Sequence, residues 1–207
     1  MEGIELMQKP APTDFPVHEL IRERWSPRAF ADRPVPQNVL RSIFEAARWA
    51  PSSSNEQPWA YLVAPKDDKV SFANMLSVLV EFNANWAKNV PVLALAVAKL
   101  MFSKNNAPNR NAPYDLGAAS AFLTVEATSR GIFVHQMAGF DSQKARQTFG
   151  IPSDWDSFAA LAIGYPGDPE SLPQSLKDRE VAPRTRKPVS EFVMTGQWGH
   201  TAPFLSK

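Results

Sequence analysis

Arg24-Trp25-Ser26-Pro27-Arg28 places two arginines and a serine around a proline near the start of the chain. Because a proline disfavours the α region for the residue before it, we expect this segment to be extended. Alternate side chains of an extended segment share one face, so the two arginines and the serine point to one side and the tryptophan to the other. Two guanidinium groups and a hydroxyl on one face can bind a phosphate through charge-assisted hydrogen bonds. The alternative is a solvated arginine cluster that pairs with Glu19 and Glu23.

A second polar segment follows after an interval long enough for one helix: Pro51-Ser52-Ser53-Ser54-Asn55-Glu56-Gln57-Pro58-Trp59. Its short hydrogen-bonding side chains lie between two prolines, which predicts a loop whose backbone N–H groups are free to meet a ligand. The order of the two segments and their spacing make the combination more specific than either segment alone.

The two motifs, Arg-x-Ser-x-Arg-x-Phe at residues 24–30 and Pro-Ser-Ser-x-Asn-x-Gln-Pro-Trp at residues 51–59, resemble the nitroreductase family of FMN-dependent oxidoreductases. The resemblance extends from Val17 to Trp198. It implies an α+β sandwich, with a central mixed and mainly antiparallel sheet flanked by helices. It also implies a domain-swapped homodimer in which both subunits contribute to each FMN site.

The resemblance further implies which residues bind the cofactor. Near the ribityl phosphate it places Arg24, Trp25, Ser26 and Arg28 of one subunit. Along the flavin it places Pro51, Ser52, Ser53 and Asn55 of the other subunit.

Three further positions match the family more loosely. Asn83 corresponds to an amide that meets the pyrimidine edge of the flavin, and the alternative is an exposed helix amide. Gln136-Met137-Ala138-Gly139 resembles the segment whose backbone approaches flavin N5, with Gly139 nearest. Some relatives carry a glutamate in place of Ala138, so this change is expected to alter substrate choice rather than abolish hydride transfer.

Two arginines near the C-terminus resemble the basic pair that completes the phosphate pocket. Arg184 and Arg186 share one side of a stretch that Pro183 and Pro188 favour as extended, so both can reach the same anion. The alternative is a solvated basic tail.

Composition limits the class of protein. A chain of 207 residues is expected to form one domain, 1–207, with an N-terminal arm at 1–16 and a C-terminal extension at 167–207. The net charge of +1 argues against a nucleic-acid binder and favours small-molecule partners. The longest apolar run, residues 90–98, is far shorter than the ~20 residues of a membrane span. We expect a cytoplasmic protein without a secretory signal or a membrane segment.

The chain lacks other recognisable catalytic apparatus. It has no cysteine, no G-x-G-x-x-G and no P-loop, and its three histidines lack metal-ligand spacing and are expected to have structural or surface roles. No metal site and no catalytic side chain are therefore expected. This pattern fits an enzyme in which a cofactor carries the chemistry.

Apolar periodicity and turn residues predict the elements. Helices are expected over residues 17–24, 37–50, 67–88, 114–130 and 143–149. Strands are expected over residues 59–64, 89–99, 132–135 and 158–166. The part from residue 167 to residue 189 is expected to be a proline-rich, charged tail.

The function that the resemblance implies is hydride transfer from NADH or NADPH through flavin N5 to an electron-poor acceptor, such as a nitroaromatic or a quinone, in a ping-pong scheme. The alternatives are another flavin reaction on the same fold (enal reduction, dehalogenation, azoline oxidation or flavin fragmentation) and a non-catalytic flavin-binding protein. Trp86, Phe102 and Phe140 either line the substrate side or belong to the core.

Overall fold

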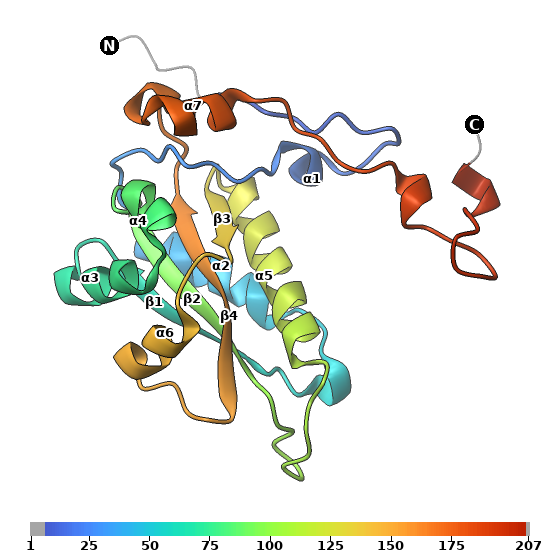
Figure 1. Ribbon diagram of the computed structural model, residues 1–207, viewed down its shortest axis with the longest axis horizontal. Helices are drawn as coiled ribbons and strands as arrows, with labels where there is room; N and C mark the ends of the chain where they lie inside the picture. Colours follow the sequence, from blue (N-terminus) through green and yellow to red (C-terminus); the bar gives the residue numbers. More distant parts are fainter. Residues whose placement is uncertain (1–6, 206–207) are drawn as a thin grey trace.

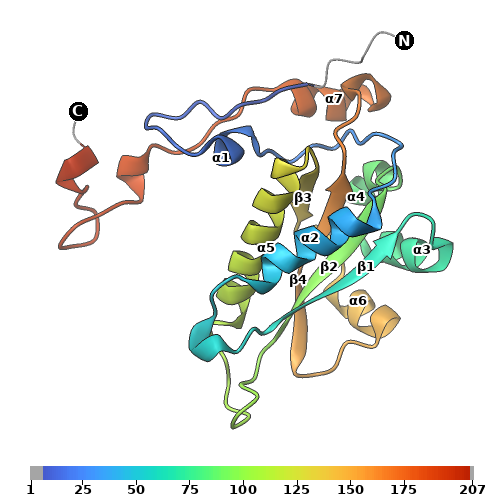
Figure 2. The ribbon, with the colours of Figure 1, turned by 180° about the vertical axis from the view of Figure 1, so that it is seen from behind.

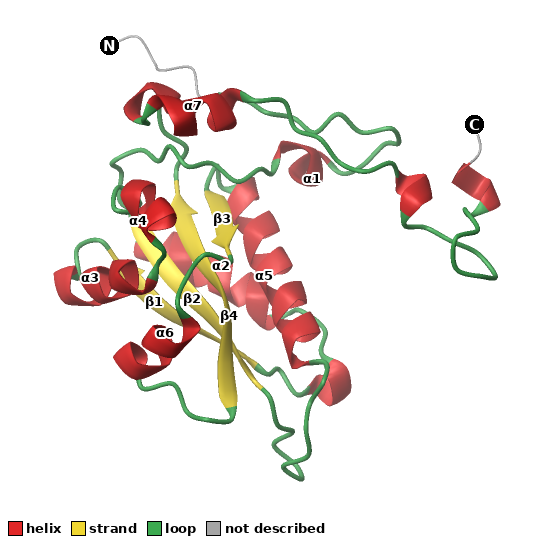
Figure 3. Ribbon diagram, viewed as in Figure 1, coloured by secondary structure: helices red, strands yellow, loops and turns green. Residues whose placement is uncertain are grey.

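The computed structural model describes residues 7–205 and contains a four-stranded sheet (Figure 3). The strands are β1 (Trp59–Pro65), β2 (Val92–Lys99), β3 (Phe133–Met137) and β4 (Trp155–Gly164). Their order in the sheet is β1-β2-β4-β3, and all three pairings are antiparallel. The predicted α+β sandwich is confirmed, although the part of the chain that the structure describes has no parallel pair that would make the sheet mixed.

Helices cover both faces of the sheet (Figures 1 and 2). One face carries α2 (Gln37–Arg48) and α5 (Ala112–Ser129). The other face carries α3 (Lys69–Val78), α4 (Glu81–Ala87) and α6 (Ser142–Phe149). The short helix α1 (Glu19–Glu23) and helix α7 (Gln174–Val181) lie at one end of the molecule, beside the N-terminal arm.

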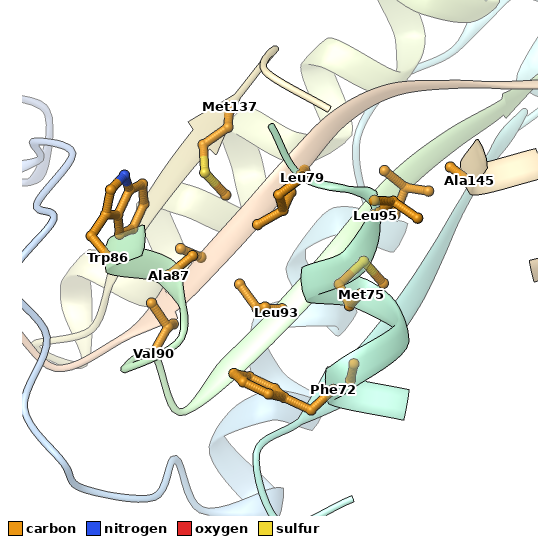
Figure 4. Packing of buried hydrophobic residues seen from close by; sticks show 14 of the residues in the cluster. Phe72, Met75, Leu79, Trp86, Ala87, Val90, Leu93, Leu95, Met137 and Ala145 are labelled. Atoms are coloured by element: carbon orange, nitrogen blue, oxygen red, sulfur yellow. The ribbon is translucent and has the colours of Figure 1, made fainter. Parts of the chain in front are cut away.

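Strand β2 is the centre of the core and is buried on both faces. Leu93 and Leu95 point toward α3 and α4, where they pack with Phe72, Met75 and Trp86 (Figure 4). The alternate residues Ala94, Ala96 and Ala98 face α2 and α5. Leu93 and Leu95 pair with alanines of β4, whereas Ala94 pairs with Leu161. Large side chains thus lie beside small ones on each face, an arrangement that favours close packing between sheet and helices.

The predicted helical segment 67–88 divides into α3 and α4 at Leu79 and Val80. Both residues at the break are extended, and the Val80 N–H donates to the carbonyl of Gly139, 3.1 Å away. Leu79 forms an isolated antiparallel bridge with Phe140. The loop after β3 therefore pairs with this break, a long-range contact that periodicity does not reveal.

Helix α7 was not predicted, because prolines and charges dominate its surroundings in the sequence. Only Leu176 and Glu180, one helical turn apart, are buried in it. After α7 the chain runs along the N-terminal arm and then projects from the sheet domain to its C-terminal end (Figure 1). Among residues 7–205, no helix is long and apolar enough to cross a membrane.

Candidate functional site

The Arg24–Arg28 segment lines a cavity of about 330 Å³ between α1, α5 and β3. As the extended conformation predicts, Arg24 and Ser26 lie on the same side, and Arg24 Nη1 is 3.3 Å from Ser26 Oγ. Arg28, expected on the same face, does not line the cavity, and its Nη1 lies 3.8 Å from Glu180 Oε2. The remaining wall of the cavity is formed by Ile21, Ala121, Thr124, Val125, Val134 and Gln136. Gln136 Nε2 donates to Thr124 Oγ1 over 3.2 Å, which links β3 to α5 across the cavity.

Trp25 points to the opposite side of the segment, as expected. It is buried, its ring meets Phe133 edge-on at 6.1 Å between centroids, and Lys9 Nζ lies 5.1 Å above it. In this protomer it anchors the segment to β3 and does not line the cavity beside Arg24.

Arg24, which lines this cavity, lies close enough to Arg184 and Arg186 of the C-terminal extension for their charges to interact. Burial, and then the charge of Arg186, lower the pKa of Arg24. Burial, followed by the charges of Arg24 and Arg186, lowers the pKa of Arg184. None of the three forms an ion pair with a carboxylate among residues 7–205. Clustered guanidinium groups without a counter-charge favour a bound anion, so these residues fit a phosphate group.

Arg184 and Arg186 are nevertheless anchored differently. Arg184 Nη1 donates to the carbonyl oxygens of Lys9, at 2.6 Å, and Arg22, at 2.9 Å. Arg186 Nη1 contacts only the carbonyl of Thr185 within the described chain, at 2.8 Å. Arg186 therefore retains more free donors than Arg184, which also fastens the extension to the arm.

Residues 51–58 form a loop stabilised by its own polar groups. Ser54, Asn55 and Gln57 all have left-handed backbone conformations, with φ of 55°, 55° and 51°. Ser52 Oγ accepts the Gln57 N–H at 3.0 Å, and the Asn55 amide oxygen accepts from Gln57 Nε2 at 3.2 Å. The Ser53 N–H donates to the buried carboxylate of Asp115, 3.1 Å away in the first turn of α5.

The two motifs lie at different levels of α5 within one protomer (Figure 2). The loop at residues 51–58 contacts Asp115, whereas the cavity beside Arg24 reaches Thr124. At ~1.5 Å rise per residue these two levels of the helix are roughly 14 Å apart. One protomer thus does not bring the motifs together.

Asn83 and the segment after β3 form a tight contact. Asn83 is buried and its Nδ2 donates to the carbonyl of Gly139 over 3.0 Å, so the alternative of an exposed helix amide is wrong. A Cβ atom at Gly139 would lie 2.5 Å from Asn83 Nδ2 and 2.9 Å from Val80 Cγ2. A larger residue here would have to displace the side chains of Asn83 and Val80, and with them the hydrogen bond from Asn83 to Gly139. The neighbouring Met137 is buried, and the Ala138 carbonyl accepts the Phe140 N–H at 3.0 Å.

The structure assigns the predicted aromatic candidates to different surroundings. Trp86 is almost fully buried, stacks on Phe30 and belongs to the core cluster shown in Figure 4. Phe140 packs against the same core cluster while partly exposed. Phe102 is partly exposed in the loop between β2 and α5. No group of three or more possible metal ligands occurs within the described range.

His135 is a further residue of the site that sequence reasoning assigned only a general structural or surface role. Its Nδ1 lies 2.7 Å from the Pro27 carbonyl, and its ring lies 4.9 Å from that of Trp86. Burial lowers the pKa of His135 to about 4 although the Pro27 carbonyl opposes the shift, and the charges of Arg28 and Arg24 lower it further. Near neutral pH the imidazole is uncharged and its Nδ1–H donates to the arginine segment.

Comparison with known proteins places these features in a family. The model of the nitroreductase family matches residues 21–165. A solved structure of an oxidoreductase containing FMN has a TM-score of 0.87 and 34% sequence identity, covering 92% of this chain and 97% of that one. A Stenotrophomonas maltophilia (strain K279a) protein with the provisional name NADH dehydrogenase/NAD(P)H nitroreductase is 26% identical over 74% of this chain and 86% of its own.

A shorter match is with an uncharacterised 15.4 kDa protein of Mycolicibacterium smegmatis. It is 41% identical over 91 residues, which are 44% of this chain and 61% of that protein.

The first prediction concerns the pH dependence of stability. The pKa of His135 is lower in the folded chain than its ordinary value of 6.5, so the unfolded chain binds more protons between these values. The neutral His135 therefore makes its full contribution to the free energy of unfolding above pH 6.5. As the pH falls toward 4, this free energy decreases by roughly 3 kcal/mol in total. Urea unfolding of the wild type and of His135→Asn, which can donate to Pro27 but cannot titrate, measures this difference. His200→Asn, at an exposed site, is the control. Equal pH slopes for wild type and His135→Asn would contradict the assignment.

The second prediction concerns the 51–58 loop. Asp115→Ala leaves the Ser53 N–H without its acceptor, so the free energy of unfolding should fall by roughly 1–3 kcal/mol. Hydrogen exchange at the Ser53 amide should accelerate in the same variant, and Asp67→Ala, at an exposed position, should change neither quantity. An unchanged exchange rate at Ser53 would show that the loop keeps its form without Asp115.

Proposed function

The chain belongs to the nitroreductase family, and from this membership we propose that it is an FMN-dependent oxidoreductase. When bound, FMN would supply hydride transfer, from NADH or NADPH through N5 to an electron-poor acceptor such as a nitroaromatic or a quinone. The observation that carries the proposal is the cluster of Arg24, Arg184 and Arg186, which has no carboxylate partner among residues 7–205 and of which Arg24 lines the cavity of about 330 Å³.

In this proposal the protein's own residues bind and orient rather than transfer protons. Arg24, Ser26 and Arg186 hold the phosphate, with Arg28 and Trp25 fixing the segment around it. Asn83 fixes the carbonyl of Gly139, so the Gln136–Gly139 segment presents its backbone in one conformation to the reactive face of the cofactor. In this proposal the barrier is lowered by alignment and by a positive pocket rather than by a side-chain acid or base.

We further propose that the site is completed by a second copy of the chain. Because one protomer keeps the 24–28 and 51–58 segments apart along α5, Pro51, Ser52, Ser53 and Asn55 would reach the flavin from the partner subunit. The arm and the extension leave a groove of about 810 Å³ lined by Phe15, Val17, Ile21, Val189 and Phe192 among others. These partly exposed apolar side chains would be covered in a homodimer, with the whole chain acting as one domain. The cytoplasm, which supplies NADH and NADPH, is the compartment of the proposed reaction.

Visible absorption tests the proposed reaction. The protein, supplemented with FMN and desalted, should keep the yellow flavin bands. These should bleach with NADH or NADPH without oxygen and return with a nitroaromatic or a quinone. Loss of all flavin on desalting would refute the phosphate pocket. Bound flavin that neither nicotinamide reduces would favour the non-catalytic alternative, and return only with enals, halogenated phenols or azolines would favour another flavin reaction.

The third prediction concerns Arg24. Arg24→Ala removes a charge-assisted phosphate contact, so FMN should bind roughly 10- to 100-fold more weakly. Riboflavin, which has no phosphate, should bind with little change. Arg41→Ala, at an exposed position of α2, is the matched control and should leave both dissociation constants unchanged. Equal losses for FMN and riboflavin would place Arg24 outside the phosphate site.

A further inference from the structure

Glu180, in the last turn of α7, is a fully buried carboxylate that the sequence did not single out. Its Oε1 accepts two backbone N–H groups of the arginine segment, from Arg28 at 2.8 Å and from Ala29 at 3.0 Å. Its Oε2 lies 3.8 Å from Arg28 Nη1. A helix of the C-terminal extension thus binds the segment that lines the anion cavity through one side chain.

The same glutamate also meets the N-terminal arm. Lys9 Nζ donates to the backbone carbonyl of Glu180, and Arg184 donates to the backbone carbonyl of Lys9. Two segments near the N-terminus, around Lys9 and Arg28, therefore share one hydrogen-bonded cluster with Glu180, which lies more than a hundred residues away in the sequence. Figure 1 shows the arm, α7 and the segment after α1 lying together at this end of the molecule.

Burying the Glu180 carboxylate costs desolvation free energy, and a leucine at this position would pack α7 against the molecule without that cost. The ion pair is not arranged for greatest strength either. Arg28 Nε and Glu180 Oε2 are both buried without a hydrogen-bond partner in the described chain. The carboxylate instead accepts hydrogen bonds mainly from the backbone N–H groups of Arg28 and Ala29. These bonds fix the position of the arginine segment.

We propose that Glu180 is a positioning residue of the anion site, an inference that rests on the proposed FMN-binding function. By holding the N–H groups of two successive residues it fixes the segment before any anion binds. By pairing with Arg28 it occupies one guanidinium, and Arg24 and Arg186 remain free to face the phosphate. Glu180 itself does not touch the anion.

Two opposed effects follow from its removal, and their sizes decide the outcome. Loss of a negative charge raises the positive potential at the cavity, but this term is weakened by distance and salt. Loss of charge-assisted bonds to two backbone N–H groups releases the segment that carries the phosphate contacts, and positioning losses of this kind are large. The second effect dominates, so anion binding weakens.

The fourth prediction uses two substitutions of this residue. Glu180→Gln keeps an acceptor oxygen but loses the charge, and Glu180→Asp keeps the charge but withdraws it by one methylene. Both should raise the FMN dissociation constant by about tenfold or more and that of riboflavin by less than about threefold. Glu170→Gln, at an exposed glutamate of the same extension that pairs with Lys177, should change neither. The dissociation constants are measured by flavin fluorescence quenching, independently of turnover.

Each result has a definite meaning. A raised ratio of FMN to riboflavin dissociation constants in both variants supports positioning, because a general loss of stability would weaken both ligands alike. An unchanged ratio would mean that Glu180 only anchors α7. Tighter FMN binding would mean that its charge only repels the phosphate. Either result would overturn the proposal. A wild type that binds riboflavin and FMN equally, or neither, would overturn the proposed function as well.

Hydrogen exchange of the wild type keeps the proposal testable if the variants do not fold. The amides of Arg28 and Ala29 should be protected to the same degree with and without FMN, because Glu180 holds them in advance. Fast exchange that slows only after FMN is added would show that the ligand, and not Glu180, orders the segment, and would overturn the proposal.

Discussion

The mutual repulsion of Arg24, Arg184 and Arg186 is the constraint around which one end of this molecule is built. Like charges in a partly buried cluster separate unless other contacts hold them. Here the contacts are backbone carbonyls of Lys9 and Arg22 for Arg184, and the hydroxyl of Ser26 for Arg24. Because these contacts are supplied by the arm and by α1, the three segments must fold onto one another before the cluster can exist. An anion bound at this cluster, as proposed for the FMN phosphate, would relieve the repulsion.

The sheet and α5 convert this local cluster into a site. Buried residues of α5, among them Leu116, Ala119 and Leu123, recur at helical spacing and pack on the alanine face of β2. This close packing fixes the helix against the sheet. Asp115 near its start holds one motif loop, and Thr124 farther along faces the other motif. The distance between the motifs is therefore a property of a rigid helix, and a second protomer is a simple way to unite them.

Much of this could be predicted from local sequence. The richness of residues 89–99 in valine and leucine predicted β2, and the proline after Ser26 correctly put Arg24 and Ser26 on one side and Trp25 on the other. What escaped prediction depends on contacts between distant segments. The break at Leu79 and Val80 exists because the Val80 N–H donates to the Gly139 carbonyl. Helix α7 is held to the rest of the chain by Glu180, which accepts the Arg28 N–H. The contact of His135 with the arginine segment could not be predicted, because its partner is the backbone carbonyl of Pro27, a group that every residue has.

The 51–58 loop shows why such a site is ordered before a ligand arrives. Left-handed conformations at Ser54, Asn55 and Gln57 cost of order 1 kcal/mol or more each for residues that carry a side chain. Hydrogen bonds accepted by Ser52 and Asn55 within the loop, and by Asp115 of α5, offset this cost. A loop that already holds its strained backbone loses little further freedom when it meets a ligand, so more of the contact energy appears as affinity. Glu180 holds the arginine segment in the same way near the other end of α5, so both halves of the proposed site would be held in place before a ligand binds.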